Sequence, residues 1–120
     1  MKSTVVQVNV ISRQGLLDAS RSYPDAQSWV NGWLPVAKRA VWTSLADVRQ
    51  TYSATDQVGQ CLVFDVKGNT YRLIVTVTWA RKAVIVGSSQ PKTFNGALYI
   101  KHFLTHAEYT KDTWKGCCYP

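Results

Sequence analysis

The 120-residue sequence lacks long hydrophobic runs and the signatures of the common nucleotide-binding and hydrolase families. No apolar run reaches the roughly 18 to 20 residues needed to cross a bilayer, and the apolar segment near the N-terminus is too short for a signal peptide. We therefore expect a cytoplasmic protein that does not contact a membrane. Because there is no P-loop and no GxGxxG, GxSxG or HExxH motif, nothing supports a nucleotide-binding protein or one of the familiar hydrolases.

Cysteine is also scarce. Cys61, Cys117 and Cys118 make an odd number, and the last two are adjacent. This spacing fits neither a disulfide framework nor a CxxC-type zinc site, so we expect free thiols in a reducing compartment. A zinc protein that uses His102, His106 and the C-terminal cysteines is an alternative, but no third ligand is well placed beside the two histidines. We therefore expect no metal and no cofactor.

Acidic residues are scarce in the C-terminal half. The net charge is +7, yet residues 1–66 hold six Lys or Arg against five Asp or Glu, whereas residues 67–120 hold eight against two. A positive field concentrated in this way favours a polyanionic partner, and nucleic acid is the natural candidate. The alternative is a basic surface that serves only solubility, because a high pI carries no information about fold or chemistry.

The hydrophobic content of 46% suits a globular protein, and the length fits a single domain over residues 1–120. Helical patterns dominate the first half, after a strand expected at 5–11. Expected helices cover residues 12–23, 25–41 and 45–52. Ser12 and Ser44 are expected to cap the first and third of these helices, and Ser44 forms a capping-box arrangement with Asp47. Pro35 lies inside the second helix and predicts a kink or a restart there.

The second half predicts strands. Those at 61–67 and 71–79 are joined around Gly68-Asn69, a strong hairpin signal because both residues tolerate positive φ. The remaining elements are a strand at 83–87, a loop at 88–96, a last strand at 98–105 and a polar C-terminal tail at 111–120. This order predicts an α+β domain with helices packed on one face of a mostly antiparallel sheet.

Alternation along the strands predicts which side chains share a face. In strand 71–79, Leu73 and Val75 share a face that we expect to form the core, so Arg72 is aimed away from it. In an unbroken last strand, His102 and His106 share a face with Leu98, Ile100 and Leu104. A bulge or a strand end before Thr105 would free His106 from that face.

The stretch 98–111 (LYIKHFLTHAEYTK) gathers groups suited to contact or proton transfer at the end of the last strand. His106, near Glu108, is the candidate for proton transfer, since histidine exchanges protons near neutral pH. Metal-free RNA cleavage also needs cations to stabilise extra charge on the phosphate. Candidate cations are Arg72, Lys67, Lys101 and Lys111. Two alternatives stay open: a purely structural histidine, and an Arg72 that only pairs with Asp65 across the hairpin.

Aromatic residues interleave with these basic ones. Rings at such positions are the usual platform for stacking single-stranded RNA bases. The candidates for stacking are Tyr71, Tyr99, Phe103 and Tyr109. The tryptophans at 29, 33, 42 and 79 lie on periodic apolar faces and are better explained as core.

Two motifs together resemble one protein family. They are VFDVKGNTYRLIVTV at Val63–Val77 and KHFLTHAEYTK at Lys101–Lys111, and the pairing of Trp33 with Trp42 fits the same pattern. The chain resembles, over roughly residues 11–114, the HigB-type toxins of bacterial toxin-antitoxin systems, within the RelE-like mRNA interferase superfamily. It departs from that pattern at Pro35 and in about a dozen additional residues between 79 and 98.

The resemblance implies a small α+β toxin that cleaves mRNA, usually on the ribosome, and that is neutralised by a helix-turn-helix antitoxin. The matching catalytic candidates are Arg72, His106, Glu108 and Tyr109. We expect RNA contacts from Lys67, Tyr71, Lys101, His102 and Lys111. The expected reaction is metal-independent attack by a 2′-hydroxyl, which leaves a 2′,3′-cyclic phosphate. The alternatives are a module that binds RNA without cutting it, and an inactivated toxin that still binds its antitoxin.

Overall fold

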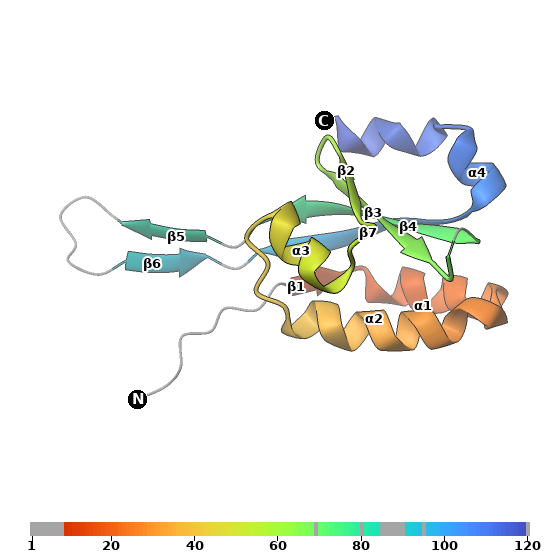
Figure 1. The fold of residues 1–120 in the computed structure, drawn as a ribbon, viewed down its shortest axis with the longest axis horizontal. Helices are drawn as coiled ribbons and strands as arrows, with labels where there is room; N and C mark the ends of the chain where they lie inside the picture. Colours follow the sequence, from red (N-terminus) through yellow and green to blue (C-terminus); the bar gives the residue numbers. More distant parts are fainter. Residues whose placement is uncertain (1–8, 69, 80, 85–90, 95, 120) are drawn as a thin grey trace.

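A computed structural model describes residues 9–68, 70–79, 81–84, 91–94 and 96–119. Its centre is a five-stranded sheet with the strand order β1-β7-β4-β3-β2 (Figure 1). The strands are β1 (Asn9–Ile11), β2 (Asp56–Val58), β3 (Cys61–Val66), β4 (Tyr71–Thr78) and β7 (Ala97–Thr105). Among the described strands, only the β1 and β7 pair is parallel, so the predicted α+β domain with a mostly antiparallel sheet is confirmed.

Helices lie on both faces of this sheet. The larger ones, on one face, are α1 (Arg13–Ser22), α2 (Gln27–Arg39) and α3 (Leu45–Thr51), with the 3₁₀ helix η1 (Pro24–Ala26) between the first two. The opposite face carries α4 (His106–Thr110) and the 3₁₀ helix η2 (Thr113–Cys118), as Figure 1 shows. The expectation of helices on one face therefore holds for α1, α2 and α3.

The main core lies between the three larger helices and the sheet. Val30, Trp33 and Ala37 of α2 are buried at the predicted helical spacing, against Phe64 and Leu73 of the sheet. Full burial of a side chain such as Val30, Phe64 or Leu73 stabilises a fold by about 1.5–3 kcal/mol. The predicted restart at residue 35 is wrong, because α2 continues through Pro35 as one helix of 13 residues.

A smaller cluster covers the other face of the sheet. Its buried members are Cys61, Val63, Ile74, Trp114 and Cys118. The expected polar tail is wrong, since residues 113–118 form η2 and place Trp114 (2% exposed) and Cys118 (0%) against the sheet. A tryptophan and a half-cystine supply enough apolar surface to dock even this short segment.

The segment that departs from the family pattern forms a two-stranded antiparallel sheet. Its strands are β5 (Arg81–Val84) and β6 (Pro91–Phe94), which extend away from the five-stranded sheet (Figure 1). The expected loop at 88–96 is therefore wrong over residues 91–94. The remainder of that loop up to residue 90, residue 95, and the end of the expected strand 83–87 lie outside the described residues.

Capping and turn predictions are confirmed in part. The Ser44 hydroxyl accepts a hydrogen bond from the Asp47 backbone N–H at 3.4 Å, whereas Ser12 makes no side-chain cap bond. In a capping box the Asp47 carboxylate would accept from the Ser44 N–H. It accepts instead from the N–H (2.9 Å) and the hydroxyl (2.7 Å) of Thr43, the preceding residue. The predicted β3–β4 hairpin is present, and its turn takes positive φ at Lys67 and Gly68; Asn69 lies outside the described residues.

A bulge in β7 decides which side chains face the candidate site. Val75 pairs with Ile100 and Ile74 with His102, so Lys101 has no partner on β4. An extra residue reverses the faces of the residues that follow it. His102 therefore lies on the face of Ile74, and the expectation that it shares a face with Ile100 is wrong.

Candidate functional site

The end of β7 and the start of α4 are locked by a reciprocal capping box. The Thr105 hydroxyl accepts a hydrogen bond from the Glu108 N–H (3.2 Å), and the Glu108 carboxylate accepts from the Thr105 N–H and hydroxyl (both 3.0 Å). These bonds hold the pKa of Glu108 below its ordinary value, and the bond from the Thr105 backbone N–H contributes most. Glu108 is thus an ionised cap near neutral pH, which makes it unsuited to donate a proton.

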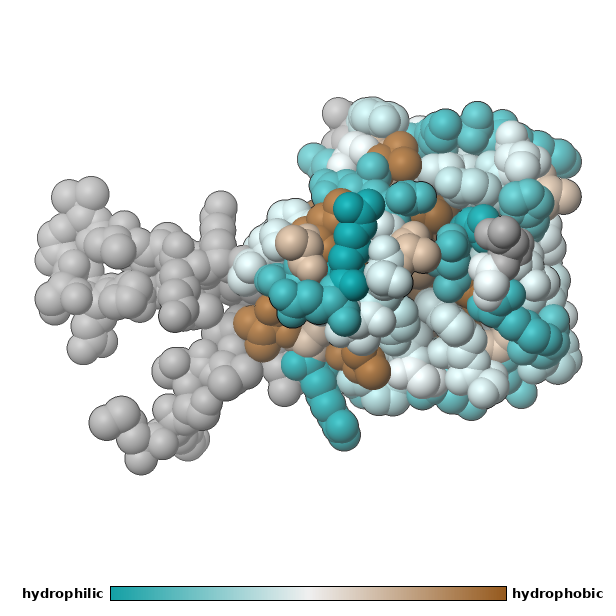
Figure 2. Space-filling model, viewed as in Figure 1, coloured by the Kyte–Doolittle hydropathy of each residue, from teal (hydrophilic) through white to brown (hydrophobic). Residues whose placement is uncertain are grey.

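His106 is the first residue of α4 and is exposed. Its backbone N–H donates to the Thr70 carbonyl at 3.1 Å, which ties the start of α4 to the start of β4. The strand ends at Thr105 and α4 begins at His106, so His106 does not lie on a face of β7. Of the two expected irregularities before Thr105, the bulge is present. The surface where α4 lies is mostly hydrophilic (Figure 2), so a polar ligand can approach this end of the sheet.

Arg72 lies beneath α4. It faces away from the main core, as predicted, but only 7% of the residue is exposed. Its Nε lies 3.1 Å from Asp65 Oδ1, one of its guanidinium NH₂ groups donates to the Tyr71 carbonyl at 3.1 Å, and its guanidinium carbon lies 5.1 Å from the centre of the Tyr109 ring. The predicted pairing with Asp65 is present, and α4 supplies the cover that strand alternation alone could not reveal.

Tyr109 joins Arg72 to η2. Its ring stacks on Trp114 with centroids 5.1 Å apart and planes 14° from parallel, and Trp114 Nε1 donates to the Tyr109 carbonyl at 2.9 Å. The structure therefore brings Arg72, Tyr109 and Trp114 into successive contact, with Asp65 paired to Arg72. Sequence analysis missed Trp114, because its side-chain position depends on how η2 docks.

The remaining cationic candidates lie on three different elements. Lys111, at the C-terminal end of α4, is exposed and its charge helps to lower the pKa of Glu108. Lys101, at the bulge, is exposed and lies 5.8 Å from the centre of the Tyr99 ring. Lys67 pairs with Asp25 at 3.4 Å on the helix-covered side. Lys111 and Lys101 are therefore the two exposed lysines that flank His106 in the chain, five positions to either side of it.

The half-buried His102 is a weaker proton-transfer candidate than His106. Partial burial, followed by the charge of Lys101, lowers the pKa of His102. Both effects disfavour the charged imidazolium, which is the form that donates a proton.

Tyr71 and Phe103 lie on the other side of the sheet from Arg72. The Tyr71 hydroxyl donates to Asp25 at 2.7 Å. This bond is the main cause, and burial the next, of a rise in the pKa of Tyr71 to about 12. The Tyr71 ring packs on Tyr23 (centroids 4.9 Å apart) and on Phe103 (5.4 Å). Two of the four expected stacking rings are therefore part of the core, while Tyr99 remains 40% exposed.

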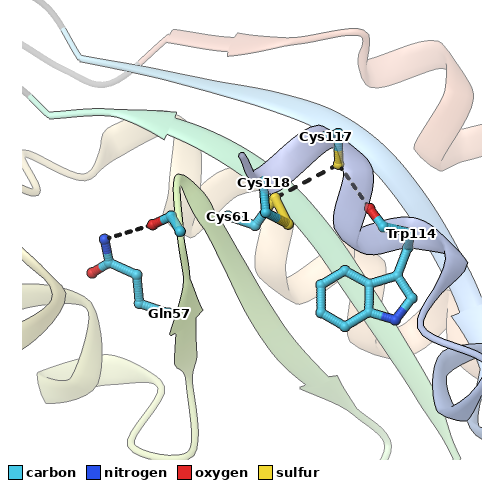
Figure 3. Close-up of a disulfide and its surroundings, with 6 residues drawn as sticks. Gln57, Cys61, Trp114, Cys117 and Cys118 are labelled. Atoms are coloured by element: carbon cyan, nitrogen blue, oxygen red, sulfur yellow. Dashed lines mark hydrogen bonds between the residues drawn. A yellow bond between two sulfur atoms is a disulfide. The ribbon is translucent and has the colours of Figure 1, made fainter. Parts of the chain in front are cut away.

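The expectation of three free thiols is wrong. Cys61 of β3 and Cys118 of η2 form a disulfide with a Cα–Cα distance of 5.0 Å, and Cys117 is free (Figure 3). Residues 57 positions apart come together because η2 returns to the sheet, which the sequence spacing does not reveal. In the described part of the chain, the three sulfur atoms lie within 4.8 Å of one another, and neither histidine belongs to that group.

A five-stranded, mostly antiparallel sheet with three helices on one face and a short helix after its last strand defines a RelE-like toxin domain. The profile of the HigB toxin family, the RelE-like toxic component of a toxin-antitoxin system, matches residues 26–112. No curated protein matches the chain. The chain belongs to the HigB toxin family, and as a toxin of such a system it has an antitoxin as partner.

The family match explains why the two motifs occur together, since both lie within it. Among the described residues, none of the helices is long and apolar enough to span a bilayer.

Proposed function

We propose that this toxin is a metal-independent endoribonuclease that cleaves mRNA on the ribosome and so stops translation. The observation that carries the proposal is an exposed histidine, His106, held at the end of β7 by the Thr105–Glu108 capping box. Membership of a toxin family supports it, as does the excess of basic residues after position 66. The substrate is a polyanion, and a positive field raises its local concentration.

The proposed proton-transfer group is His106. Its exposure lets a ribose 2′-hydroxyl reach the ring, and histidine is the side chain best suited to exchange protons near neutral pH. Attack of the 2′-oxygen on phosphorus expels the 5′-oxygen and leaves a 2′,3′-cyclic phosphate. The charge that develops on the phosphate needs cations within reach, and Lys111 and Lys101 are the exposed candidates.

Arg72 and Glu108 are assigned positioning roles. Arg72 is too buried to grip a phosphate as an open fork, but its guanidinium supports the Tyr109 ring. Glu108 fixes the first turn of α4 and thereby the backbone of His106. Tyr109, supported in this way, is the ring on which we propose that a base stacks. Of the other expected RNA contacts, His102 lies on the sheet face that carries Arg72. Lys67 pairs with Asp25 on the helix-covered side, and Tyr71 belongs to the core.

The test is cleavage of an mRNA by purified protein, with and without translating ribosomes. His106→Gln should lower the cleavage rate at least about 100-fold, which is the usual contribution of a general acid or base. His102→Gln is the matched control and should stay within a few-fold of wild type. The RNA 3′ ends should carry a cyclic phosphate, and removal of metals from the purified protein before it is added to the assay should leave the rate unchanged. A His106→Gln protein that still cleaves at the wild-type rate, or that remains fully toxic in cells without antitoxin, contradicts the assignment.

A second candidate is a toxin-like protein that binds RNA and antitoxin without cutting RNA. It is favoured by one observation: Glu108 and Arg72 both have structural roles, in the cap and beneath Tyr109. Binding of a labelled mRNA with no cleavage on ribosomes would support this candidate. A short helix-turn-helix protein encoded beside the chain would identify the antitoxin, and co-expression should then restore growth only if the chain is toxic.

A further inference from the structure

The three cysteines meet where the C-terminal segment docks on the sheet. The Cys61 and Cys118 sulfurs are bonded and both residues are fully buried, whereas Cys117 is half-buried. Figure 3 shows the Cys117 sulfur directed at the disulfide, 3.6 Å from Cys61 Sγ, with its thiol also donating to the Trp114 carbonyl at 3.2 Å. A buried disulfide therefore has a more accessible thiol in contact with it.

We propose that these residues form a thiol–disulfide exchange site, in which Cys117 is the entry thiol and the Cys61–Cys118 bond clasps η2 to β3. In reducing compartments, protein disulfides are usually transient and serve redox sensing or catalysis. Exchange requires access to a sulfur atom, and η2 covers the Cys61–Cys118 bond. A more accessible thiol in contact with that bond is therefore needed to pass the exchange from the solvent to it.

The exchange proceeds in balanced steps with a low-molecular-weight disulfide such as oxidised glutathione as oxidant. The Cys117 thiolate attacks this disulfide, forms a mixed disulfide and releases one glutathione thiolate. The Cys61 thiolate then attacks the Cys117 sulfur and releases the second glutathione thiolate. Finally, the Cys118 thiolate attacks the Cys61 sulfur and releases Cys117. Two protein thiols are oxidised and one glutathione disulfide is reduced, and reduced glutathione drives the same steps backwards.

Apart from the disulfide, few contacts hold η2 on the sheet. The backbone of η2 is tied to the β2–β3 turn by the hydrogen bond from the Gln60 N–H to the Cys118 carbonyl (2.8 Å). Among the described residues, the second cluster has five buried members and four partly buried ones. One of them, Trp114, supports Tyr109. Opening the clasp therefore loosens the ring that covers Arg72. This consequence rests on the proposed function, because it makes the redox state a regulator of the RNA-binding end of the molecule.

The first measurement maps the bonds in the full chain after oxidation with glutathione disulfide, acid quenching and trypsin digestion. Cys61 lies in the tryptic peptide 50–67, and both other cysteines lie in peptide 116–120, where fragmentation between them assigns the bond. We expect Cys61 linked to Cys118. In Cys118→Ser, we expect the link to move to Cys117. If all three cysteines of the oxidised wild type are still alkylated after unfolding, the clasp does not exist.

The second measurement follows the rate of reduction by glutathione. Cys117→Ser should keep the Cys61–Cys118 bond and the melting temperature of the oxidised protein, but it should be reduced at least about tenfold more slowly than wild type, because its disulfide has lost the accessible partner. Equal rates in the two proteins overturn the relay.

A third measurement tests the docking of the segment. Reduction of wild type should lower the melting temperature by about 5–15 °C and speed trypsin cleavage after Lys111 and Lys115. Cys61→Ser, or the double variant Cys117→Ser/Cys118→Ser if the former does not fold, should lose this redox dependence at peptide bonds near residue 118. Cleavage rates that do not depend on redox state in wild type contradict a clasp.

The competing occupant of three clustered thiols is a metal ion. If reduced protein binds one equivalent of Zn²⁺ and can then no longer form the disulfide, the cluster is a metal site and the exchange proposal fails. None of these measurements uses RNA. A protein that exchanges but never cleaves RNA refutes the proposed function alone, whereas one that cleaves RNA but keeps all three thiols free after treatment with glutathione disulfide refutes the clasp alone.

Discussion

Replacing Arg72 with alanine should lower the free energy of unfolding by about 2–4 kcal/mol. The Arg72 side chain is 9% exposed and that of its partner Asp65 is 33% exposed, so their ion pair lies between a surface pair, worth about 0–1 kcal/mol, and a buried pair, whose disruption costs about 3–5 kcal/mol. The contact with the Tyr109 ring adds about 0.5–2 kcal/mol, since the ring and the guanidinium are partly desolvated. The expected total lies within these bounds.

Urea unfolding followed by tryptophan fluorescence measures this change. Arg21→Ala is the matched control, because Arg21 also pairs with an aspartate, but the two side chains are 71% and 58% exposed; we expect a change below about 0.5 kcal/mol. Asp65→Asn and the double variant complete a cycle, in which we expect a coupling of about 1–2 kcal/mol between Arg72 and Asp65. An Arg72→Ala protein with the urea midpoint of wild type would refute the positioning role.

RNA cleavage by the same variant separates the contribution of Arg72 to stability from its contribution to catalysis. If Arg72 acts through Tyr109, Arg72→Ala loses RNA cleavage even when rates are compared per folded molecule, and Tyr109→Ala should cause a similar loss. If Arg72 only stabilises the fold, cleavage per folded molecule stays near the wild-type rate. The comparison is meaningful only under conditions where urea titration shows both proteins to be folded, which the first measurement supplies.

Three further predictions concern single contacts. Glu108→Gln should lower stability at neutral pH, and the difference should vanish as the pH falls through the lowered folded pKa of Glu108, below 4.5, where the wild-type carboxyl is also protonated; unfolding at several pH values checks this. Tyr71→Phe should raise the pKa of Asp25, whose largest lowering comes from the tyrosine hydroxyl, as measured by NMR titration of side-chain carboxyls. Gly59→Ala should destabilise the protein and its docked C-terminus, because Gly59 has φ +55° and a Cβ there would collide with the end of η2, whereas Gly15→Ala in α1 has open space and should gain about 0.5–1 kcal/mol in urea unfolding.

Helix and hairpin positions could be predicted because they depend on local patterns. The apolar spacing from Ala26 to Ala37 specifies which side of α2 is buried, whatever it packs against. The hairpin between β3 and β4 follows from a turn rich in residues that tolerate positive φ. The restart expected at Pro35 does not occur, because the cost of a proline is local and the burial of Trp33 and Ala37 on either side of it favours one continuous helix.

The docked C-terminal segment could not be predicted in the same way. Trp114 and Cys118 stand in a stretch of Thr, Lys and Gly with no periodic pattern, so nothing in the sequence distinguishes a packed 3₁₀ helix from a solvated tail. The helix before this segment does have a signal in the sequence. Thr105 and Glu108 have the T-x-x-E spacing of a capping box, which indicates that a helix starts after the last strand.

The composition of the site depends most on a single extra residue. Alternation is reliable only while a strand is continuous, and the unpaired Lys101 shifts His102 and Leu104 to the face that carries Arg72. The main core explains where the bulge falls. Leu98 and Phe103 both pack on the helix side, although they are five positions apart and would face opposite sides in a continuous strand. The inserted residue lets β7 place both of them on that side. The same insertion leaves a lysine without a partner on β4, four residues before the strand ends and α4 begins. Packing on one face of the sheet thus selects which groups are available on the other, and this is why the candidate site follows from the core and not from the motif alone.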